Sequence, residues 1–409
     1  MRFSDLKRTK AESERKEPPP RAPARREPAP EEPKLQEAPP AAVIAAEPAA
    51  PRPETVPPVA DRQEAIKKHS GAYKPASRKE PRSAPKPLPP FRDQDGAARA
   101  LYSRLVEQAG ELLKGADQAY TEKYEAVARS CDLAAETLRE NPVLLNYVAH
   151  STADDYLKAH SANTAIIALA LGLAAGLEAS ELRLLGFCAM AHDIGMTGYA
   201  DLYNREGRLT EEEFSRITQH AEAGAEKLDR IVDIDYRIKD RAKKILLQVH
   251  ERLDGSGYPR RFSKEDLDPL AQLIGIADVY EAMTHPRAWR EALEPPEVVK
   301  DLIECEGRGF DCAAVRHLIS ALSIYPPQSL VVLSTGEIAR VIRLNKGSLT
   351  RPLVEVLLTE DFAAAPAQTL DLMEYPLTAI EGSASLAEIQ ERNPKFAARL
   401  ELARWWVNW

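Results

Sequence analysis

The sequence is poor in cysteine and contains no long apolar run. Its 409 residues include four scattered cysteines, and none of them forms a CxxC pair. This excludes a disulfide-built scaffold and fits a reducing compartment. The longest apolar run, residues 165–177, has about 13 residues, whereas a membrane-spanning helix needs about 20. The charged start MRFSDLKRTKAESERKE also lacks the apolar centre of a secretory leader. We therefore expect a cytoplasmic protein with no membrane span.

Glycine is nearly absent from the first 90 residues, where only Gly71 occurs, but 20 of the 32 prolines lie there. Such a segment buries too little apolar surface to offset the entropy lost on ordering. We therefore predict a disordered tail over residues 1–91. With 19 basic against 13 acidic residues up to position 90, it carries a net charge of +6. The sequence leaves open whether the tail is a spacer or a docking segment for a protein partner.

The rest of the chain is acidic, with 36 basic against 50 acidic residues and a net charge of −14. Binding to a nucleic-acid polymer needs a cationic face toward the phosphate backbone. An acidic body therefore excludes broad nucleic-acid binding.

Hydrophobic spacing favours a mainly α protein. Residues 92–149 read as a helical N-terminal region, because Leu101, Leu105, Leu112 and Leu113 recur on one helical face. Residues 150–325 read as an all-helical domain. Across both regions, further helices are expected near residues 121–139, 143–150, 153–177, 180–193, 210–228, 236–252, 269–284 and 295–321.

The pattern changes after residue 325. Short runs rich in Val, Leu and Ile, broken at Thr335-Gly336 and Lys346-Gly347, predict a small β module over residues 326–380. Residues 381–409 predict a C-terminal helical segment. Three tryptophans in its last five residues would either pack back on the protein or form an interaction surface.

Histidine and aspartate residues far apart in the helical domain are the candidates for chemistry. A single histidine on a helix is usually a core residue, but imidazole and carboxylate together suit iron, manganese, nickel or zinc. Asp193 directly follows His192, and such a carboxylate can bridge two ions. Two metals about 3.5–4 Å apart generate hydroxide at neutral pH and clamp a phosphoryl group. The candidate ligands are His160, His192, Asp193, His220, His250 and Asp278.

Several motifs resemble the HD-GYP domain, a branch of the HD phosphohydrolases. Over residues 150–320 these are HSANTAIIALALGLAAGL, AMAHDIGMTGY, GRLTEEEFSRITQHAEAGAEKL, HERLDGSGYP and IGIADVYEAMTHPRAWREAL, in the family's order and spacing. The segment YPPQSLVVLSTGEIARVI is similar to a β extension common after this domain.

The resemblance implies an all-helical, metal-dependent phosphohydrolase fold that holds two, sometimes three, divalent ions. It also implies hydrolysis of the bacterial second messenger cyclic di-GMP to pGpG or GMP. By position, the first metal would be held by His160, His192, Asp193 and Asp278. Asp193, the candidate catalytic residue, would bridge to a second metal held by His220 and His250.

The resemblance also places candidate substrate-binding residues. The signature loop corresponds to Gly257, Tyr258 and Pro259. Arg287 and Arg290 stand at the family's basic positions, where they would contact substrate phosphates or form ion pairs on a helix surface.

Three departures from the family pattern affect activity. Met196 stands where the family has a lysine near the scissile phosphate, and loss of such a cation typically lowers a rate by roughly 10²–10³. Val249 replaces a histidine ligand before His250, which predicts a weakened second site that water could complete. Tyr156, beside Asp155, replaces the glutamate of three-metal members, so we expect no more than two metals.

These observations leave three functions open. The first is a metal-dependent cyclic di-GMP phosphodiesterase. The second is a catalytically impaired HD-GYP domain that binds cyclic di-GMP or serves as a scaffold. The third is an HD phosphohydrolase that acts on another nucleotide or phosphoester.

Overall fold

The computed structural model describes residues 91–409, except for gaps at 116–122, 141, 150–155, 206, 232, 263–265, 288–289, 306, 346 and 406–409. The predicted disordered tail, up to residue 90, lies outside the described residues. The side chains of the three C-terminal tryptophans also lie outside them.

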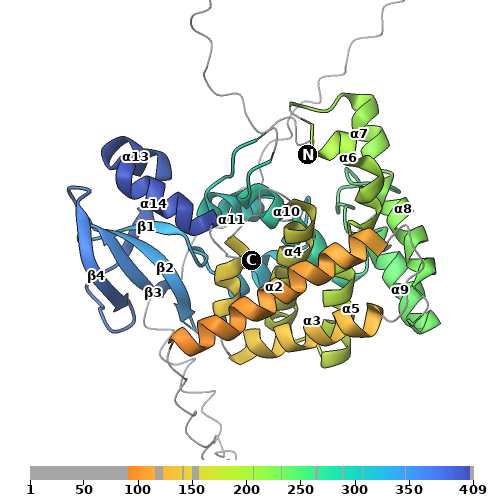
Figure 1. Cartoon of the computed structure of the whole chain (residues 1–409), viewed down its shortest axis with the longest axis horizontal. Helices are drawn as coiled ribbons and strands as arrows, with labels where there is room; N and C mark the ends of the chain where they lie inside the picture. The colour runs from red at the N-terminus through yellow and green to blue at the C-terminus, as the bar shows by residue number, and fades with distance from the viewer. Residues whose placement is uncertain are drawn as a thin grey trace, which may run out of the picture. The chain divides into compact units, whose positions relative to one another are not determined.

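Helices dominate the chain before residue 323, which confirms the mainly α prediction (Figure 1). In chain order they are α2 (Phe91–Gly115), α3 (Lys123–Glu140), η1 (Pro142–Ala149), α4 (Tyr156–Ala174), α5 (Ala179–Ala191), η2 (Ile194–Tyr199), α6 (Ala200–Tyr203), α7 (Glu211–Ile217), α8 (His220–Lys227), η3 (Leu228–Arg230), α9 (Tyr236–Leu246), α10 (Pro269–Thr284), α11 (Pro295–Glu304) and α12 (Cys312–Leu322).

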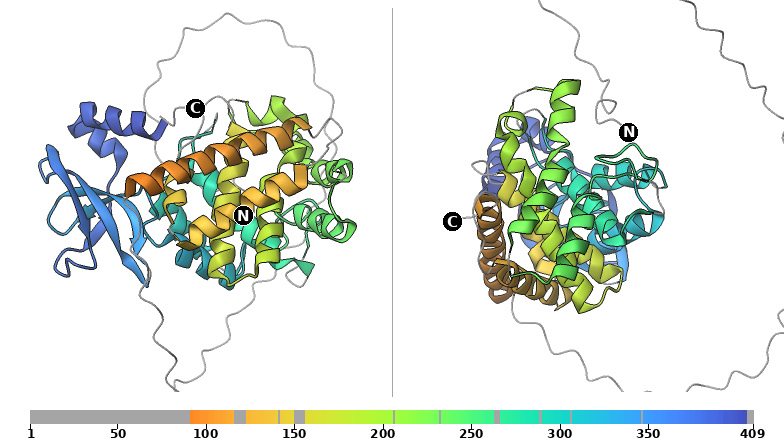
Figure 2. Two further views of the ribbon diagram at one scale, coloured as in Figure 1. Left: turned by 60° about the horizontal axis from the view of Figure 1, so that its bottom comes forward. Right: turned by 90° about the vertical axis from the view of Figure 1, so that its right-hand side faces the viewer.

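The core of the helical part is built around α4. This helix is buried on nearly all sides, as expected for a helix enclosed by neighbours, and it packs against α2, α3, α5, α10 and α12. The helices α2 and α3 lie side by side next to it (Figures 1 and 2). Among the described residues, α4 alone is long and apolar enough to cross a membrane, but 83% of that stretch is buried inside the protein.

Capping residues set where the helices around the core begin. Asp268 accepts a hydrogen bond from the Leu270 amide at the start of α10, where Pro269 takes the first helical position. Thr210 and Glu213 form a reciprocal capping box at the start of α7. These caps explain helix starts that hydrophobic spacing alone places only approximately.

Three predicted helices are shorter or interrupted in the structure. The stretch 210–228 divides into α7 and α8, and the stretch 295–321 divides into α11 and α12. Gly307 lies in the second break with a φ of +77°, a conformation that glycine adopts without a Cβ penalty. The stretch 236–252 ends as a helix at Leu246, so His250 lies in the turn that follows α9.

A five-stranded antiparallel sheet follows the helices, as the change of pattern predicts. Its strands β1 (Leu330–Leu333), β2 (Ile338–Asn345), β3 (Ser348–Leu358), β4 (Ala364–Asp371) and β5 (Ile380–Ser383) are arranged in the order β4-β3-β2-β1-β5. The turns after β1 and β2 contain Gly336 and Gly347, with φ of +82° and +86°. Val331 pairs with Ala339 and Val341 with Val354 in one buried cluster.

Two short helices follow the sheet. They are α13 (Leu386–Arg392) and α14 (Pro394–Trp405). Ile389 of α13 and Ala397 of α14 are buried in a cluster with residues of the sheet.

Candidate metal centre

Five separate segments bring the six predicted ligands together. His160 lies on α4 and Asp278 on α10, while His192 and Asp193 join α5 to η2. His220 is the first residue of α8, and His250 lies in the turn after α9. The side chains form two groups of potential metal ligands, His160, His192 and Asp278 in one and Asp193, His220 and His250 in the other.

Asp193 lies between the two groups. Its Oδ2 atom is 3.5 Å from Nε2 of both His160 and His192. Its Oδ1 atom is 3.3 Å from Nε2 of His220 and 3.8 Å from Nε2 of His250. Each carboxylate oxygen therefore faces a different group, which is the arrangement that a bridging ligand requires.

Asp278, on α10, also lies close to histidines of both ligand groups. Its Oδ1 atom is 3.3 Å from Nε2 of His160 and 4.0 Å from Nε2 of His192. Its Oδ2 atom is 3.5 Å from Nδ1 of His250. Asp278 thus faces the first group and also steadies a histidine of the second.

Backbone carbonyls fix the ring orientation of two histidines. Nδ1 of His192 donates to the Ala189 carbonyl at 2.8 Å, and Nδ1 of His220 donates to the Ile217 carbonyl at 2.8 Å. Because a carbonyl oxygen can only accept, each Nδ1 carries the proton. When these two rings are neutral, the Nε2 atom of each therefore carries a lone pair that points into the centre.

Burial and opposite charge control ionisation in the centre. Burial alone would raise the pKa of Asp193, but His192 and the other histidines around the carboxylate hold this pKa well below its ordinary value. The pKa of Asp278 is likewise well below its usual range, because His160 and His250 outweigh its burial. Both carboxylates are therefore negative at neutral pH.

The histidines respond to the same field. Burial lowers the pKa of His192. The pKa of His250 is raised, because its burial is outweighed by Asp193 and Asp278. A negative centre that attracts protons to imidazole nitrogens attracts divalent cations in the same way, and the two compete for one lone pair.

Two buried atoms show that the centre fits a metal. Within the described part of the chain, Nε2 of His192 and Oδ1 of Asp193 are buried and have no hydrogen-bond partner. Buried polar atoms are nearly always satisfied, so each such exception calls for a partner. Nitrogen and carboxylate donors together suit first-row divalent metals. The residues present therefore fit the expected ions.

The signature loop folds back onto the chain next to His250. The Tyr258 amide donates to the His250 carbonyl at 3.2 Å, and the Tyr258 ring stacks on the His250 ring with centroids 4.9 Å apart. A Cβ atom on Gly257 would lie 2.5 Å from the His250 carbonyl oxygen and from Cα of Glu251. Glycine is therefore required there, and the peptide bond between Tyr258 and Pro259 is cis.

Glu251 holds the far end of this loop, a role that the motif did not reveal. Its fully buried carboxylate accepts hydrogen bonds from the amides of Arg260 at 2.7 Å and Phe262 at 3.1 Å. The loop contacts thus position His250, and substrate binding by Gly257, Tyr258 and Pro259 stays a prediction.

The two predicted basic residues occupy different places. The guanidinium of Arg287 lies 3.7 Å from the centroid of the Tyr156 ring, and its Nη2 donates to Glu281 at 3.2 Å. Its side chain is only 9% exposed. Arg290 donates to two carbonyl oxygens near the end of α10. Arg287 therefore lies close to the metal centre, and Arg290 closes the helix end. Contact with substrate remains a prediction for both.

The departures from the family pattern are all packed into the fold. Met196 is 8% exposed and buried in an apolar cluster with Leu113 and Leu157. Val249 is fully buried in the main core. The ring of Tyr156 lies 5.6 Å from the His160 ring, between centroids. Asp155 lies outside the described residues. An apolar side chain thus fills each of the first two positions, and the completion of the second site by water stays a prediction.

Motif reasoning missed Glu281 and Asn163, which contact the ligands from behind. Glu281 is 1% exposed, and its carboxylate lies 2.5 Å from Nδ1 of His160. Asn163 donates to the same carboxylate at 3.0 Å. A sequence signal existed, because Glu281 lies one helical turn after Asp278 on the same face of α10.

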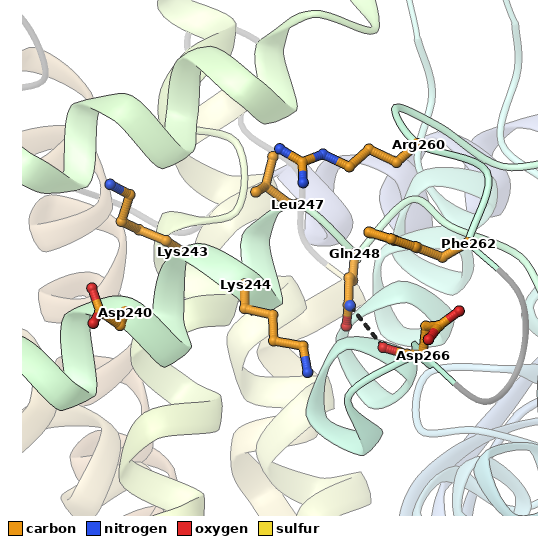
Figure 3. A pocket seen from close by; sticks show the side chains of 8 residues that line it. All are labelled: Asp240, Lys243, Lys244, Leu247, Gln248, Arg260, Phe262 and Asp266. Carbon is orange, nitrogen blue, oxygen red and sulfur yellow. Dashed lines mark hydrogen bonds between the residues drawn. The ribbon is translucent and has the colours of Figure 1, made fainter.

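A separate hollow of about 600 Å³ lies beside α9 (Figure 3). It is lined by Asp240, Lys243, Lys244, Leu247, Gln248, Arg260, Phe262 and Asp266. Gln248 donates to the Asp266 carbonyl at 2.9 Å and accepts from the Asp268 amide at 2.7 Å. None of the six candidate ligands lines this hollow. The two hydrogen bonds of Gln248 at this hollow hold in place the turn that carries His250.

Comparison with known families agrees with the two folded regions. Residues 142–313 match the HD domain, and residues 330–392 match the KOW domain associated with HD domain. The first match includes all six candidate ligands, and the second covers the sheet and α13.

Two curated relatives and one solved structure are similar to the chain. A Pseudomonas aeruginosa protein named cyclic di-GMP phosphodiesterase is 32% identical over 59% of this chain and 58% of its own. A Vibrio cholerae protein named 3'3'-cGAMP-specific phosphodiesterase 2 is 26% identical over 56% of this chain and 44% of its own. A structure described as an HDG"Y"P protein from Bdellovibrio bacteriovorus is 20% identical, with a TM-score of 0.47, over 56% of this chain and 72% of that one.

The chain thus spans less than two thirds of the length of these curated relatives. The family match, the relatives and the ligand motifs nevertheless agree. The helical region of the chain is therefore similar to the HD domain, and the sheet with α13 is similar to the KOW domain associated with HD domains.

Proposed function

We propose that the protein is a metal-dependent phosphodiesterase that hydrolyses cyclic di-GMP to pGpG or GMP. The observation that carries this proposal is the position of Asp193, whose two oxygens face two separate groups of ligands. The name of the Pseudomonas aeruginosa relative supports the substrate. A cytoplasmic location goes with this substrate, since the messenger is made and used inside the cell.

The proposed centre takes two ions. His160, His192 and Asp278 would hold the first and His220 and His250 the second, with Asp193 shared between them. When bound, such a pair supplies Lewis-acid activation of water and of the phosphoryl group. The ligand chemistry accepts iron, manganese, nickel or zinc. The Tyr156 position offers a phenol ring in place of a carboxylate, which supports two ions over three.

The protein side chains orient and enclose this centre. The carbonyls behind His192 and His220 hold their Nε2 atoms inward before any ion arrives, so neither of these two rings has to reorient. Tyr258 covers one face of His250 and excludes water from it. Asp193 and Asp278 supply two negative charges that offset the charge of the ions.

An exposed aromatic ring beside the centre supports a nucleotide substrate. Phe214 of α7 is 51% exposed, although a ring of this size is usually covered. It packs edge to face against Tyr258, with centroids 6.1 Å apart. Because nucleobases stack on aromatic rings, we assign the exposed ring of Phe214, held in place by Tyr258, as a platform for one guanine.

The packing of Met196 favours a second candidate function. Methionine in the apolar cluster with Leu113 and Leu157 supplies no cation to a scissile phosphate. A protein of this kind would bind cyclic di-GMP and hydrolyse it slowly or not at all, as a receptor or scaffold. The predicted partner surfaces, the N-terminal tail and the tryptophan-rich end, remain predictions outside the described residues and side chains.

The test starts with protein purified without oxygen and its metal content per chain. The protein is incubated with cyclic di-GMP, and separately with 3'3'-cGAMP, because a relative carries that name. Asp193→Asn removes the bridging charge at nearly constant shape. Asp201→Asn is the matched control, since Asp201 is an exposed carboxylate on α6 that pairs with Arg216.

We expect hydrolysis of cyclic di-GMP by the metal-loaded protein, loss of turnover in Asp193→Asn, and normal turnover in Asp201→Asn. Metal-loaded protein that binds cyclic di-GMP and leaves it intact over hours would establish the receptor instead. Cleavage of 3'3'-cGAMP with cyclic di-GMP untouched would reassign the substrate. A chain that takes up no divalent metal refutes all of these.

A further inference from the structure

We propose that Glu281 is a positioning residue that sets the tautomer and orientation of His160, and that Tyr102 of α2 supports it through Asn163. This inference rests on the metal centre of the proposed function. It extends the centre to a helix that lies outside the region matched as the HD domain, since α2 ends at Gly115 and the match begins at residue 142.

Glu281 lies against three donors, of which His160 and Asn163 are on α4 and Arg287 follows α10. Its Oε2 atom is 2.5 Å from Nδ1 of His160 and 3.2 Å from Nη2 of Arg287. Its Oε1 atom accepts from Nδ2 of Asn163 at 3.0 Å. The guanidinium of Arg287 and the amide nitrogen of Asn163 can only donate, so both oxygens of the Glu281 carboxylate act as acceptors.

The accepting carboxylate of Glu281 fixes the proton of His160. Nδ1 of His160 must donate to the carboxylate, so in the neutral ring Nε2 carries the lone pair. That atom lies 3.5 Å from Asp193 and 3.3 Å from Asp278, inside the first group of ligands. A carboxylate behind a ligating histidine both holds the ring in place and raises its basicity toward the metal.

A directional chain of hydrogen bonds then reaches α2. The Tyr102 hydroxyl donates to Oδ1 of Asn163 at 3.0 Å, which leaves Nδ2 of Asn163 to donate to Glu281. The order of donors and acceptors is therefore fixed from Tyr102 to His160, and the Asn163 amide has a single consistent orientation. Tyr102, His160 and Glu281 are each at most 2% exposed, so water does not substitute easily for a lost partner.

The Tyr102 side chain is itself held by its surroundings. Its ring stacks on the Tyr147 ring with centroids 5.6 Å apart, and the Tyr147 hydroxyl donates to Asp95 of α2 at 2.7 Å. The packed ring of Tyr102 thus holds its hydroxyl in position to donate to Asn163. Through this hydrogen bond, α2 helps to hold the first group of ligands in place.

The experiment measures binding of Mn²⁺ alone to the full-length, metal-stripped chain by calorimetry. It compares the wild type with Glu281→Gln and Tyr102→Phe. Tyr280→Phe is the matched control, because Tyr280 is also buried, lies next to Glu281, and its hydroxyl makes no hydrogen bond within the described residues. The thermal midpoint of each metal-free variant is recorded alongside, so that loss of stability is separated from loss of affinity.

We expect Glu281→Gln to weaken Mn²⁺ binding by about 10- to 100-fold, the usual effect of losing a partner behind a ligand. We expect Tyr102→Phe to weaken binding in the same direction by less, and Tyr280→Phe to leave it unchanged. A metal affinity in Glu281→Gln equal to that of the wild type overturns the positioning role.

The remaining outcomes are also decisive. If Glu281→Gln does not fold, Tyr102→Phe decides, since it removes one oxygen atom and keeps the ring. Equal affinities in Tyr102→Phe and Tyr280→Phe overturn the part assigned to α2. If the wild type binds no Mn²⁺, the metal centre and this inference are both overturned. If the wild type binds Mn²⁺ and Glu281→Gln binds it with the same affinity, only this inference is overturned.

Discussion

Gly195 offers the sharpest test of how closely the two halves of the centre must approach. It lies in η2, two residues after Asp193, and faces the first turn of α8. A Cβ atom there would lie 2.0 Å from the His220 carbonyl oxygen and 2.7 Å from the Gly224 amide nitrogen. Both obstacles are backbone atoms, so no side chain can rotate away. Gly195→Ala must therefore push η2 and α8 apart.

The size of this shift follows from the contact distances. Real Cβ contacts are not shorter than about 3.0 Å, so the two segments must separate by at least about 1 Å. Asp193 and His220 lie on opposite sides of this contact, and metal–ligand distances tolerate only about 0.2 Å. We expect turnover to fall about 100-fold, as for other displacements of 1 Å. Overpacking should lower the free energy of unfolding by about 1–3 kcal/mol.

Gly198→Ala is the matched control. Gly198 lies in the same η2 turn, but a Cβ atom there would meet nothing within 4 Å. The assays are metal content per chain, turnover of cyclic di-GMP and unfolding by urea. Loss of one metal per chain in Gly195→Ala, with Gly198→Ala normal, is the expected result. If Gly195→Ala keeps full metal content and turnover, the separation of η2 and α8 does not control the second group.

Further predictions concern the neighbouring residues. Tyr258→Ala removes the ring stacked on His250 and should reduce metal affinity at the second group, whereas Tyr258→Phe should bind metal like the wild type; equal affinities would contradict the stacking role. Phe214→Ala should raise KM for cyclic di-GMP by about 5- to 100-fold, since stacking contributes about 1–3 kcal/mol per base, with kcat little changed; an unchanged KM argues against the platform. Val249→His places an imidazole in the main core and should lower the free energy of unfolding by about 1–3 kcal/mol in urea titrations; a stabilised variant with extra bound metal would reverse that expectation. Removal of metal with a chelator should lower Tm relative to protein kept in free metal at 100 times its Kd, because binding at that concentration stabilises the native state by about 2.7 kcal/mol. A Tm that does not change with chelator would show that no ion binds the native state.

The six candidate ligands could be proposed from the sequence because they lie in recognisable motifs, as in the His192-Asp193 pair, and the structure brings them together in two groups. Helical periodicity and the turn at Gly336 likewise predict the change from helices to a sheet. These are local features, and local features are what periodicity and turn chemistry record.

Other features could not be read from the sequence because they depend on contacts between distant segments. Tyr102 and Glu281 are 179 positions apart, and neither stands out as a ligand. The burial of Met196 and Val249 decides whether a missing ligand leaves a gap or a packed side chain, and only the fold shows that both are packed. The break between α7 and α8 was missed because residues 210–228 keep helical spacing across it.

The position of α2 and α3 has a practical consequence for how the protein is handled. Tyr102, Leu105 and Leu112 of α2 are almost fully buried in the same apolar core as α4. A recombinant fragment cut to the limits of the family match, residues 142–313, would expose that apolar surface to water. Such a fragment would be prone to aggregate, and a lack of activity in it would say nothing about the intact chain. Expression boundaries for this protein should therefore start before α2.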